Sequence, residues 1–255
     1  LSYLMAEEPT QDPFPNGGPA DGVVVYGGKT SRVVKVLWVC AELRVKAYHL
    51  PVMQQRSAAW FAAINPKKQV PAFKDGTLTL HESNTICHYL ASKYGPETRA
   101  PDGTVSASNG GILPLTHEAS AIASMWTEFA ETTIAPAQNP VFFGLVRKGP
   151  VGCAASPTGE KLPGCPSDEQ LRAHVLKLQQ AWSIFNEALA GKDYVTGDRF
   201  TLGDVCAAVQ ANRLIRNNGF GCPELALDGF PHVVSWFSRV SARPAFQEQV
   251  APYYS

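Results

Sequence analysis

The sequence predicts an α+β protein of two domains, in which a βαβαββα domain over residues 23–94 precedes an all-helical domain over residues 116–255. Two observations predict the first domain. Short apolar runs typical of strands alternate with helical patterns, and an Asp-Gly turn joins the last two strands. A third observation predicts the second domain, because apolar residues after the linker recur at helical spacing and two capping signals open helices.

The expected elements of the first domain follow in order along the chain. Residues 23–26 form a short apolar run typical of a buried strand, and residues 33–40 place apolar side chains at i, i+3, i+4 and i+7, as an amphipathic helix does. A second strand is expected at residues 48–50 and a short helix at residues 58–64. Residues 1–22 are rich in proline and glycine, so we expect an irregular N-terminal arm.

A β-hairpin and a helix complete this domain. Residues 70–73 are apolar, Asp75-Gly76 is a strong two-residue turn signal, and residues 78–80 alternate as a half-buried strand does. The helix over residues 82–94 opens with Glu82-Ser83 and carries one apolar stripe. Its N-terminus offers unpaired N–H groups, which bind carboxylates.

Helical patterns dominate after a linker at residues 95–115 that is rich in glycine, proline and serine. One helix is expected over residues 117–138. Residues 167–170 read Ser-Asp-Glu-Gln, a capping box that opens a second helix, and residues 201–204 contain another N-cap signal. Pro231 suits the first turn of a further helix.

The segment PKKQVPAFKDGTLTLHESNTICHYLASKY, residues 66–94, resembles the glutathione site of the cytosolic glutathione S-transferase superfamily. Three further segments also resemble this family, including its bacterial-type members with theta-like and nu-like features: GGKTSRVVKVLWVCAEL, MWTEFAETTIAPAQNPVFFGLVRK and GDRFTLGD. The resemblance covers residues 23–255. It implies a thioredoxin-like fold for residues 23–94, an all-helical second domain, a homodimer, and transferase chemistry used in detoxification.

The resemblance also implies which residues bind glutathione. It implies a cis Val70–Pro71 bond, which would turn the N–H and C=O of Val70 toward an extended tripeptide, and X-Pro bonds reach cis at low cost. Gln69, Glu82 and Ser83 are expected to hold the charged ends of the ligand, with its γ-glutamyl carboxylate at Ser83. The alternatives are an ordinary edge-strand proline and a serine that only caps the helix.

Glutathione reacts as a thiolate, so its site needs a hydrogen-bond donor and a positive field. The loop before the first helix offers both in Lys29, Thr30, Ser31 and Arg32. Ser31 matches the serine of theta-like members and is the preferred donor. Thr30 matches the nu-like alternative, in which Arg32 stands where asparagine is expected. Either hydroxyl could instead serve only as a helix cap. No cysteine lies in this loop, which disfavours an omega-like mechanism.

Charge and cysteine content narrow the expected partners. The formal charge of the chain is zero, but residues 23–94 carry ten Lys or Arg and three acids, a local charge of +7 that suits a small anionic ligand. These basic residues are spread along the segment and do not cluster, and no nucleic-acid-binding motif is present, so we expect no nucleic-acid partner.

The six cysteines show no metal-ligand spacing, so we expect no bound metal. No apolar stretch has the length of a membrane span, and we expect a cytoplasmic protein, or an organellar one after processing.

The sequence favours a glutathione transferase that conjugates glutathione to a small hydrophobic electrophile. Two alternatives stay open. One is a glutathione-dependent disulfide reductase, and the other is a non-catalytic subunit of a larger assembly, similar to the gamma subunit of a translation elongation factor. The arm and an inserted loop at residues 149–168 favour the assembly role. The hydroxyl loop and Glu82-Ser83 favour the enzyme.

Overall fold

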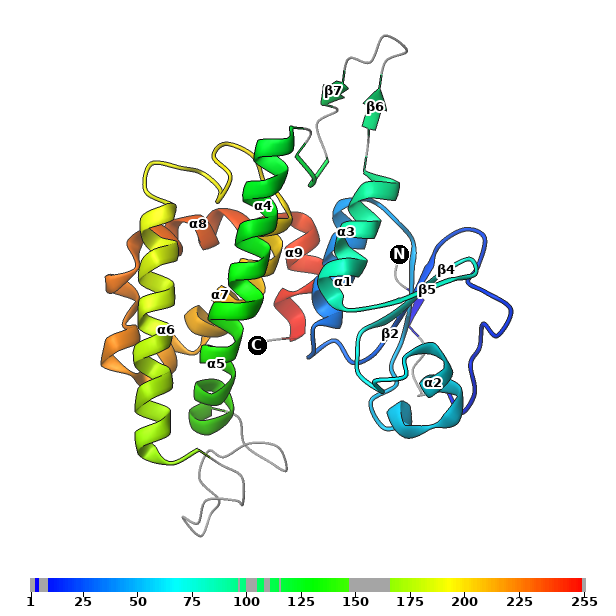
Figure 1. Ribbon diagram of the computed structural model, residues 1–255, viewed down its shortest axis with the longest axis horizontal. Helices are drawn as coiled ribbons and strands as arrows, with labels where there is room; N and C mark the ends of the chain where they lie inside the picture. The colour runs from blue at the N-terminus through cyan, green and yellow to red at the C-terminus, as the bar shows by residue number, and fades with distance from the viewer. Residues whose placement is uncertain are drawn as a thin grey trace. The chain divides into compact units, whose positions relative to one another are not determined.

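The computed structural model describes residues 3–4, 9–95, 97–99, 105–107, 111–114, 116–146 and 166–253. The chain forms two compact units, each with its own core (Figure 1). The first unit contains residues 1–117 together with residues 243–255, and the second contains residues 118–242. The loop expected at residues 149–168 lies outside the described residues except for its last three.

The first unit is built on a five-stranded sheet in the order β1-β3-β2-β4-β5. The strands are β1 (Tyr3–Leu4), β2 (Val23–Tyr26), β3 (Ala47–Leu50), β4 (Ala72–Asp75) and β5 (Leu78–His81). β1 and β2 run parallel to β3, whereas β4 pairs antiparallel with β2 and with β5. The βαβαββα order expected for residues 23–94 is confirmed.

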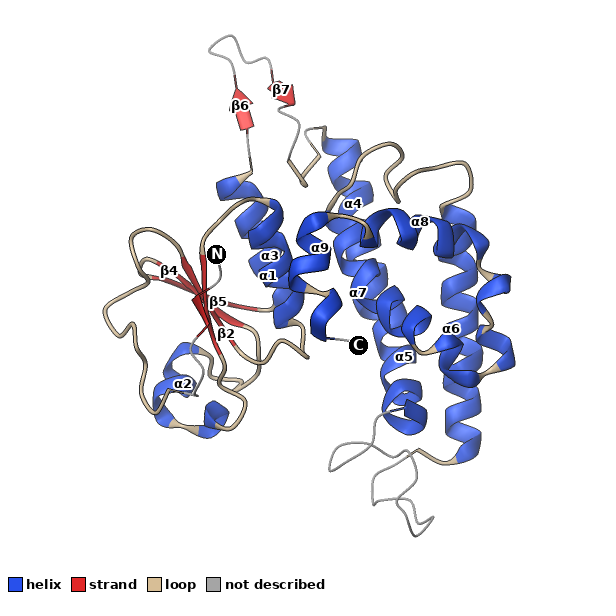
Figure 2. Ribbon diagram, turned by 180° about the vertical axis from the view of Figure 1, so that it is seen from behind, coloured by secondary structure: helices blue, strands red, loops and turns tan. Residues whose placement is uncertain are grey.

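Two helices lie on one face of this sheet and one lies on the other (Figure 2). α1 (Val33–Glu42) packs beside α3 (Ser83–Tyr94), and α2 (Ala59–Ile64) covers the opposite face. On the α2 side, the fully buried ring of Tyr26 lies 6.2 Å from that of Phe61. Strand residues alternate between the two faces, so each face has its own apolar core.

Two boundaries differ from the expectation. The N-terminal arm is not wholly irregular, because Tyr3–Leu4 pairs with Tyr48 and His49 as an added edge strand. Residues 243–255 were expected in the helical domain, but they belong to the first unit. There, α9 (Pro244–Gln249) packs on α1, with the Phe246 and Trp38 rings 5.0 Å apart. Arg243 also forms two hydrogen bonds to the Glu42 carboxylate, with N···O distances of 2.8 and 2.7 Å. Aromatic packing and a two-pronged ion pair hold this segment there.

The second unit is helical, as expected. Its α-helices are α4 (His117–Phe129), α5 (Ala135–Val141), α6 (Asp168–Ala188), α7 (Leu202–Arg216) and α8 (Pro231–Ser241). Two π-helical turns follow α4 and α5, so the helix expected over residues 117–138 continues to Val146 with altered pitch. Pro136 and Pro140 lie in this stretch and cannot donate backbone hydrogen bonds, which explains the interrupted α pattern. Trp126 lies in the core, 5.3 Å from the ring of Phe185.

Both predicted capping signals are present. Ser167 Oγ accepts from Gln170 N at 3.2 Å, while Gln170 Oε1 accepts from Ser167 N at 2.8 Å. At α7, Asp204 Oδ2 accepts from Thr201 N at 2.8 Å and from the Thr201 hydroxyl at 3.2 Å. Asp204 Oδ1 also accepts from Val195 N at 2.9 Å and from Trp236 Nε1 at 2.8 Å. One fully buried carboxylate therefore joins α7, α8 and the turn before α7.

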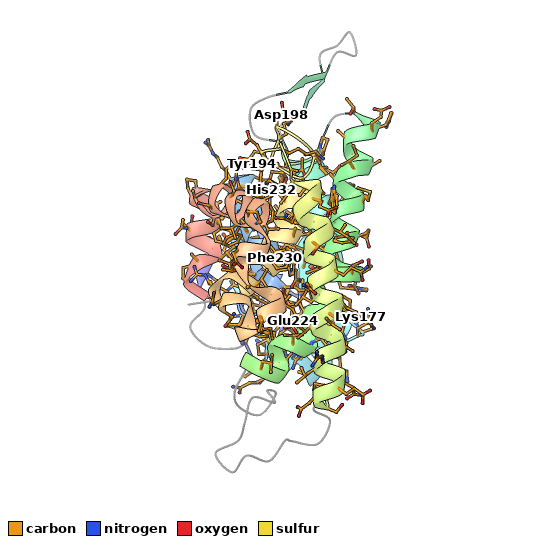
Figure 3. All side chains as sticks on the ribbon, turned by 90° about the vertical axis from the view of Figure 1, so that its left-hand side faces the viewer. Lys177, Tyr194, Asp198, Glu224, Phe230 and His232 are labelled. Carbon is orange, nitrogen blue, oxygen red and sulfur yellow. The ribbon has the colours of Figure 1, made fainter. Side chains whose placement is uncertain are left out.

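We predict that Asp204→Asn lowers the free energy of unfolding by about 2 to 3 kcal/mol, because the amide group would face backbone N–H donors and leave them unsatisfied. Burial raises the pKa of Asp204 to about 6, and its four donors oppose that rise. Denaturant unfolding measures the change. Asp198→Asn is the matched control, because this exposed residue lies at one end of the helical unit (Figure 3) and should change stability by less than about 0.5 kcal/mol. Equal losses of unfolding free energy in the two variants would contradict the stabilising role given to the Asp204 carboxylate.

Candidate functional site

Three segments of the first unit meet at one edge of the sheet. Tyr26, the last residue of β2, pairs with Ala72, the first residue of β4, and Ala72 pairs with His81, the last residue of β5. The loop after Tyr26, the peptide bond before Ala72 and the start of α3 are therefore neighbours. Gly27 shows how close they are, because a Cβ atom on it would lie 2.6 Å from Val70 Cβ. With φ at +127°, this position also favours glycine.

The Val70–Pro71 peptide bond is cis, as expected. The loop before it is organised by Asn65, whose side chain is 2% exposed. Asn65 Nδ2 donates to Gln69 O at 2.7 Å, and Asn65 Oδ1 accepts from Lys67 N at 3.0 Å. Gln69 itself is exposed. Asn65 was not predicted from the sequence, although an Asn-Pro pair is a recognised turn signal.

The two candidate hydroxyls differ in their surroundings. Ser31 Oγ donates to Gly28 O at 2.6 Å and accepts from Val33 N at 3.3 Å, so this hydroxyl orders the turn that leads into α1. The Thr30 side chain is exposed, and its hydroxyl has no hydrogen-bond partner within the described part of the chain. Thr30 is therefore the hydroxyl that can donate to a ligand without breaking a bond in the protein.

Two buried basic residues, Lys35 and His49, lie close to the segments of the candidate site. Lys35, on α1, is 1% exposed and its Nζ donates to Asn84 Oδ1 on α3. His49 Nε2 lies 2.6 Å from Gly27 O, and burial lowers the pKa of His49, with the nearby charge of Lys29 adding to the effect. Lys35 therefore connects the first turn of α1 to the first turn of α3. The contacts of Lys35 and His49 could not be predicted from the sequence, because neither contact is local in sequence.

Glu82 stands at the entrance of α3 with φ at +70° and ψ at 112°, a conformation that non-glycine residues rarely adopt. Its Oε1 lies 2.6 Å from Lys67 Nζ and 3.8 Å from His81 Nδ1. Lys67 lowers the pKa of Glu82, burial opposes this, and His81 and Arg32 add to the lowering. The predicted site residues Arg32 and Glu82 are thus within electrostatic reach of each other.

Ser83 is the first residue of α3 and is 5% exposed. Glu82 holds the N-cap position of this helix and its side chain makes no capping hydrogen bond, so Ser83 is not the N-cap. The arrangement as a whole combines a helix N-terminus, a cis-proline loop and a hydroxyl loop with several basic side chains. These features suit an anionic peptide-like ligand that carries a reactive group near Thr30.

In the part of the chain that the structure describes, no helix has the length and apolar character needed to cross a bilayer. Among the same residues, no group of three or more His, Cys, Asp or Glu side chains is arranged to hold a metal ion.

Comparison with known proteins gives consistent matches. Residues 25–98 match the family model described as Glutathione S-transferase, N-terminal domain, and residues 156–244 match Glutathione S-transferase, C-terminal domain. Glutathione S-transferase 3 of Zea mays is 32% identical over 192 residues, which cover 75% of this chain and 74% of the relative. Glutathione S-transferase theta-1 of Rattus norvegicus is 30% identical over 182 residues, covering 71% and 65% respectively.

A solved structure is similar over nearly its whole length. It is the theta class glutathione S-transferase from Xanthomonas axonopodis pv. citri with glutathione bound, which matches with a TM-score of 0.71 and 25% identity, covering 90% of this chain and 97% of that one. The two domain models match in order along the sequence, and the maize relative passes 30% identity over most of its length. The chain therefore belongs to the glutathione S-transferase family, whose members are transferases.

Proposed function

We propose that this protein is a glutathione transferase that conjugates the glutathione thiolate to a small hydrophobic electrophile. The observation that carries the proposal is the strand register Tyr26–Ala72–His81, which sets the hydroxyl loop, the cis Val70–Pro71 bond and the start of α3 side by side. The glutathione bound in the Xanthomonas relative supports the choice of ligand. The reaction takes place where reduced glutathione is abundant, as in the cytosol.

Binding uses backbone and side-chain groups along the ligand. The N–H and C=O of Val70 pair with the tripeptide backbone as an added strand would. Ser83 donates its hydroxyl and N–H hydrogens to the γ-glutamyl carboxylate, and Glu82 receives the ammonium group. Gln69, which is exposed, contacts the charged end of the ligand. Each contact is available from a segment that already borders the same edge of the sheet.

Activation of the thiol uses the loop before α1. A donor hydroxyl and the positive field of Arg32, buried Lys35 and the α1 N-terminus lower the thiol pKa. We assign the donor to Thr30, whose hydroxyl is exposed, and the ordering of the loop to Ser31, whose hydroxyl binds Gly28 O. This departs from the preference for Ser31 drawn from sequence, which stays a prediction that the variants below test.

The proposal includes a homodimer, as the family architecture suggests. Ile122 and Met125 lie one turn apart on α4, with 41% and 54% of their surfaces exposed in the single chain. Apolar side chains on a helix face at this spacing suit contact with a second subunit.

The first prediction here concerns the donor. Thr30→Ala should lower conjugation of a chloronitrobenzene by about 10- to 1,000-fold, because a lost donor to a developing anion has an effect of that order. Ser31→Ala should reduce conjugation less. Steady-state kinetics with each variant measures the difference, with a small mixed disulfide as second substrate.

If only Ser31→Ala loses conjugation activity, Ser31 is the donor, as the sequence predicts. Turnover of the disulfide alone by the wild type identifies a reductase, and glutathione binding without any turnover identifies a non-catalytic subunit.

The second prediction concerns Ser83. Ser83→Ala should weaken glutathione binding roughly 10- to 150-fold, since it removes one hydrogen bond to a charged group. Isothermal titration calorimetry measures the affinity, and a denaturant melt of the same samples measures stability. If Ser83 has only a structural role, the substitution should instead lower the free energy of unfolding by about 1 kcal/mol and leave the glutathione affinity unchanged.

The third prediction concerns Lys67, which already pairs with Glu82. The ligand's ammonium must displace Lys67 from Glu82, so Lys67→Gln should tighten glutathione binding by about 2- to 5-fold, the value of an exposed ion pair. Lys68→Gln is the matched control, because Lys68 is adjacent, exposed and equally charged. An analogue of glutathione without the amino group should bind Lys67→Gln and wild type alike. Weaker glutathione binding by Lys67→Gln would show that Lys67 holds the ligand instead.

A further inference from the structure

One acidic residue of the N-terminal arm, Asp12, contacts side chains of two strands that border the proposed site. Asp12 Oδ1 accepts from the Tyr26 hydroxyl at 2.9 Å and from Phe14 N at 3.0 Å. Asp12 Oδ2 forms an ion pair with Lys74 Nζ, which also donates to Phe14 O at 2.9 Å. The Lys74 and Asp12 side chains are only 9% and 12% exposed, so this is a buried ion pair rather than a surface one.

The partners of Asp12 belong to the two strands that lead to the site. Tyr26 ends β2 directly before Gly27, and Lys74 lies two residues after Ala72 on β4. Tyr26 pairs with Ala72, and Val24 pairs with Lys74, so the Tyr26 and Lys74 side chains point to the same face of the sheet as diagonal neighbours. Asp12 therefore bridges β2 and β4, from Tyr26, which directly precedes the hydroxyl loop, to Lys74, two residues into the strand that follows the cis-proline loop.

The same arm has a second tie that does not involve these strands. Asp21 binds Lys46 Nζ at 2.5 Å and accepts from the Tyr48 hydroxyl at 2.8 Å, and both partners lie at or beside β3. Phe14 packs against the Tyr48 ring at 5.9 Å. The arm is thus anchored at β3 without Asp12, and the contacts of Asp12 have a separate effect on β2 and β4.

We infer that Asp12 is a positioning residue for the proposed glutathione site. Its buried carboxylate holds Tyr26 and Lys74 together, and this keeps the hydroxyl loop and Val70 at the spacing that an extended tripeptide needs. A buried charge that loses one partner is left poorly solvated, so the two strands cannot separate at this point without a large penalty. The inference rests on the proposed function for its consequence in binding, but not for its consequence in local structure.

The test compares Asp12→Asn with Asp21→Asn in the full chain. Asp12→Asn should weaken glutathione binding roughly 3- to 30-fold in titration calorimetry, the range of coupling through a packed network, with the KM for the electrophile unchanged. Asp21→Asn should stay within about 2-fold. Amide hydrogen exchange gives a readout that needs no ligand: Asp12→Asn should speed exchange in residues 27–33 and 72–74, whereas Asp21→Asn should not.

Folded Asp12→Asn with wild-type affinity, or with faster exchange confined to residues 9–22, overturns the inference. If the wild type binds no glutathione, the proposed function fails, while the exchange comparison still decides the role of Asp12. If Asp12→Asn does not fold, Tyr26→Phe decides in its place, because it removes one hydroxyl and keeps the buried ring. It should show the same changes at smaller size, and their absence overturns the inference.

Discussion

The pairing of Tyr26 with Ala72, and of Ala72 with His81, is the constraint on which the site depends. A shift of one residue in this register would turn every β4 side chain to the opposite face and move Pro71 away from Gly27. Three segments that are far apart in sequence meet because β2 and β5 end, and β4 begins, at the same level of the sheet. Gly27 adds a steric condition, since any side chain there would collide with Val70.

The charges at this edge of the sheet fit the glutathione proposed as its ligand. Lys29 and Lys35 are almost completely buried, and Arg32 and Lys67 act on Glu82 from the surface. Buried cations exert a stronger field than exposed ones because water screens them less. These charges suit an anionic ligand and a thiolate, while Glu82 supplies a negative charge for an ammonium group. Lys67, a cation, forms an ion pair with Glu82, so the positive and the negative charges of the proposed site contact each other directly.

Local sequence signals predicted much of this structure. The Asp-Gly turn and the capping boxes at Ser167 and Thr201 depend on neighbouring residues, so they could be derived from the sequence alone. The cis bond before Pro71 was instead expected from the family resemblance. The contacts that could not be predicted join distant residues: Lys35 with Asn84, Asp12 with Lys74, and α9 with α1. A single sequence contains periodicity and turn chemistry but no record of which distant side chains meet. The different surroundings of Thr30 and Ser31 also needed the structure, because only the geometry shows which hydroxyl already has a partner.

The central claim is that these three segments form one binding site for glutathione, and NMR titration of the ¹⁵N-labelled protein tests it most directly. On addition of glutathione, we expect amide shift changes that saturate together for residues 28–33, for Gln69 and Val70, and for residues 82–84. Saturable changes that cluster elsewhere in the chain, or no changes at millimolar glutathione, would contradict it.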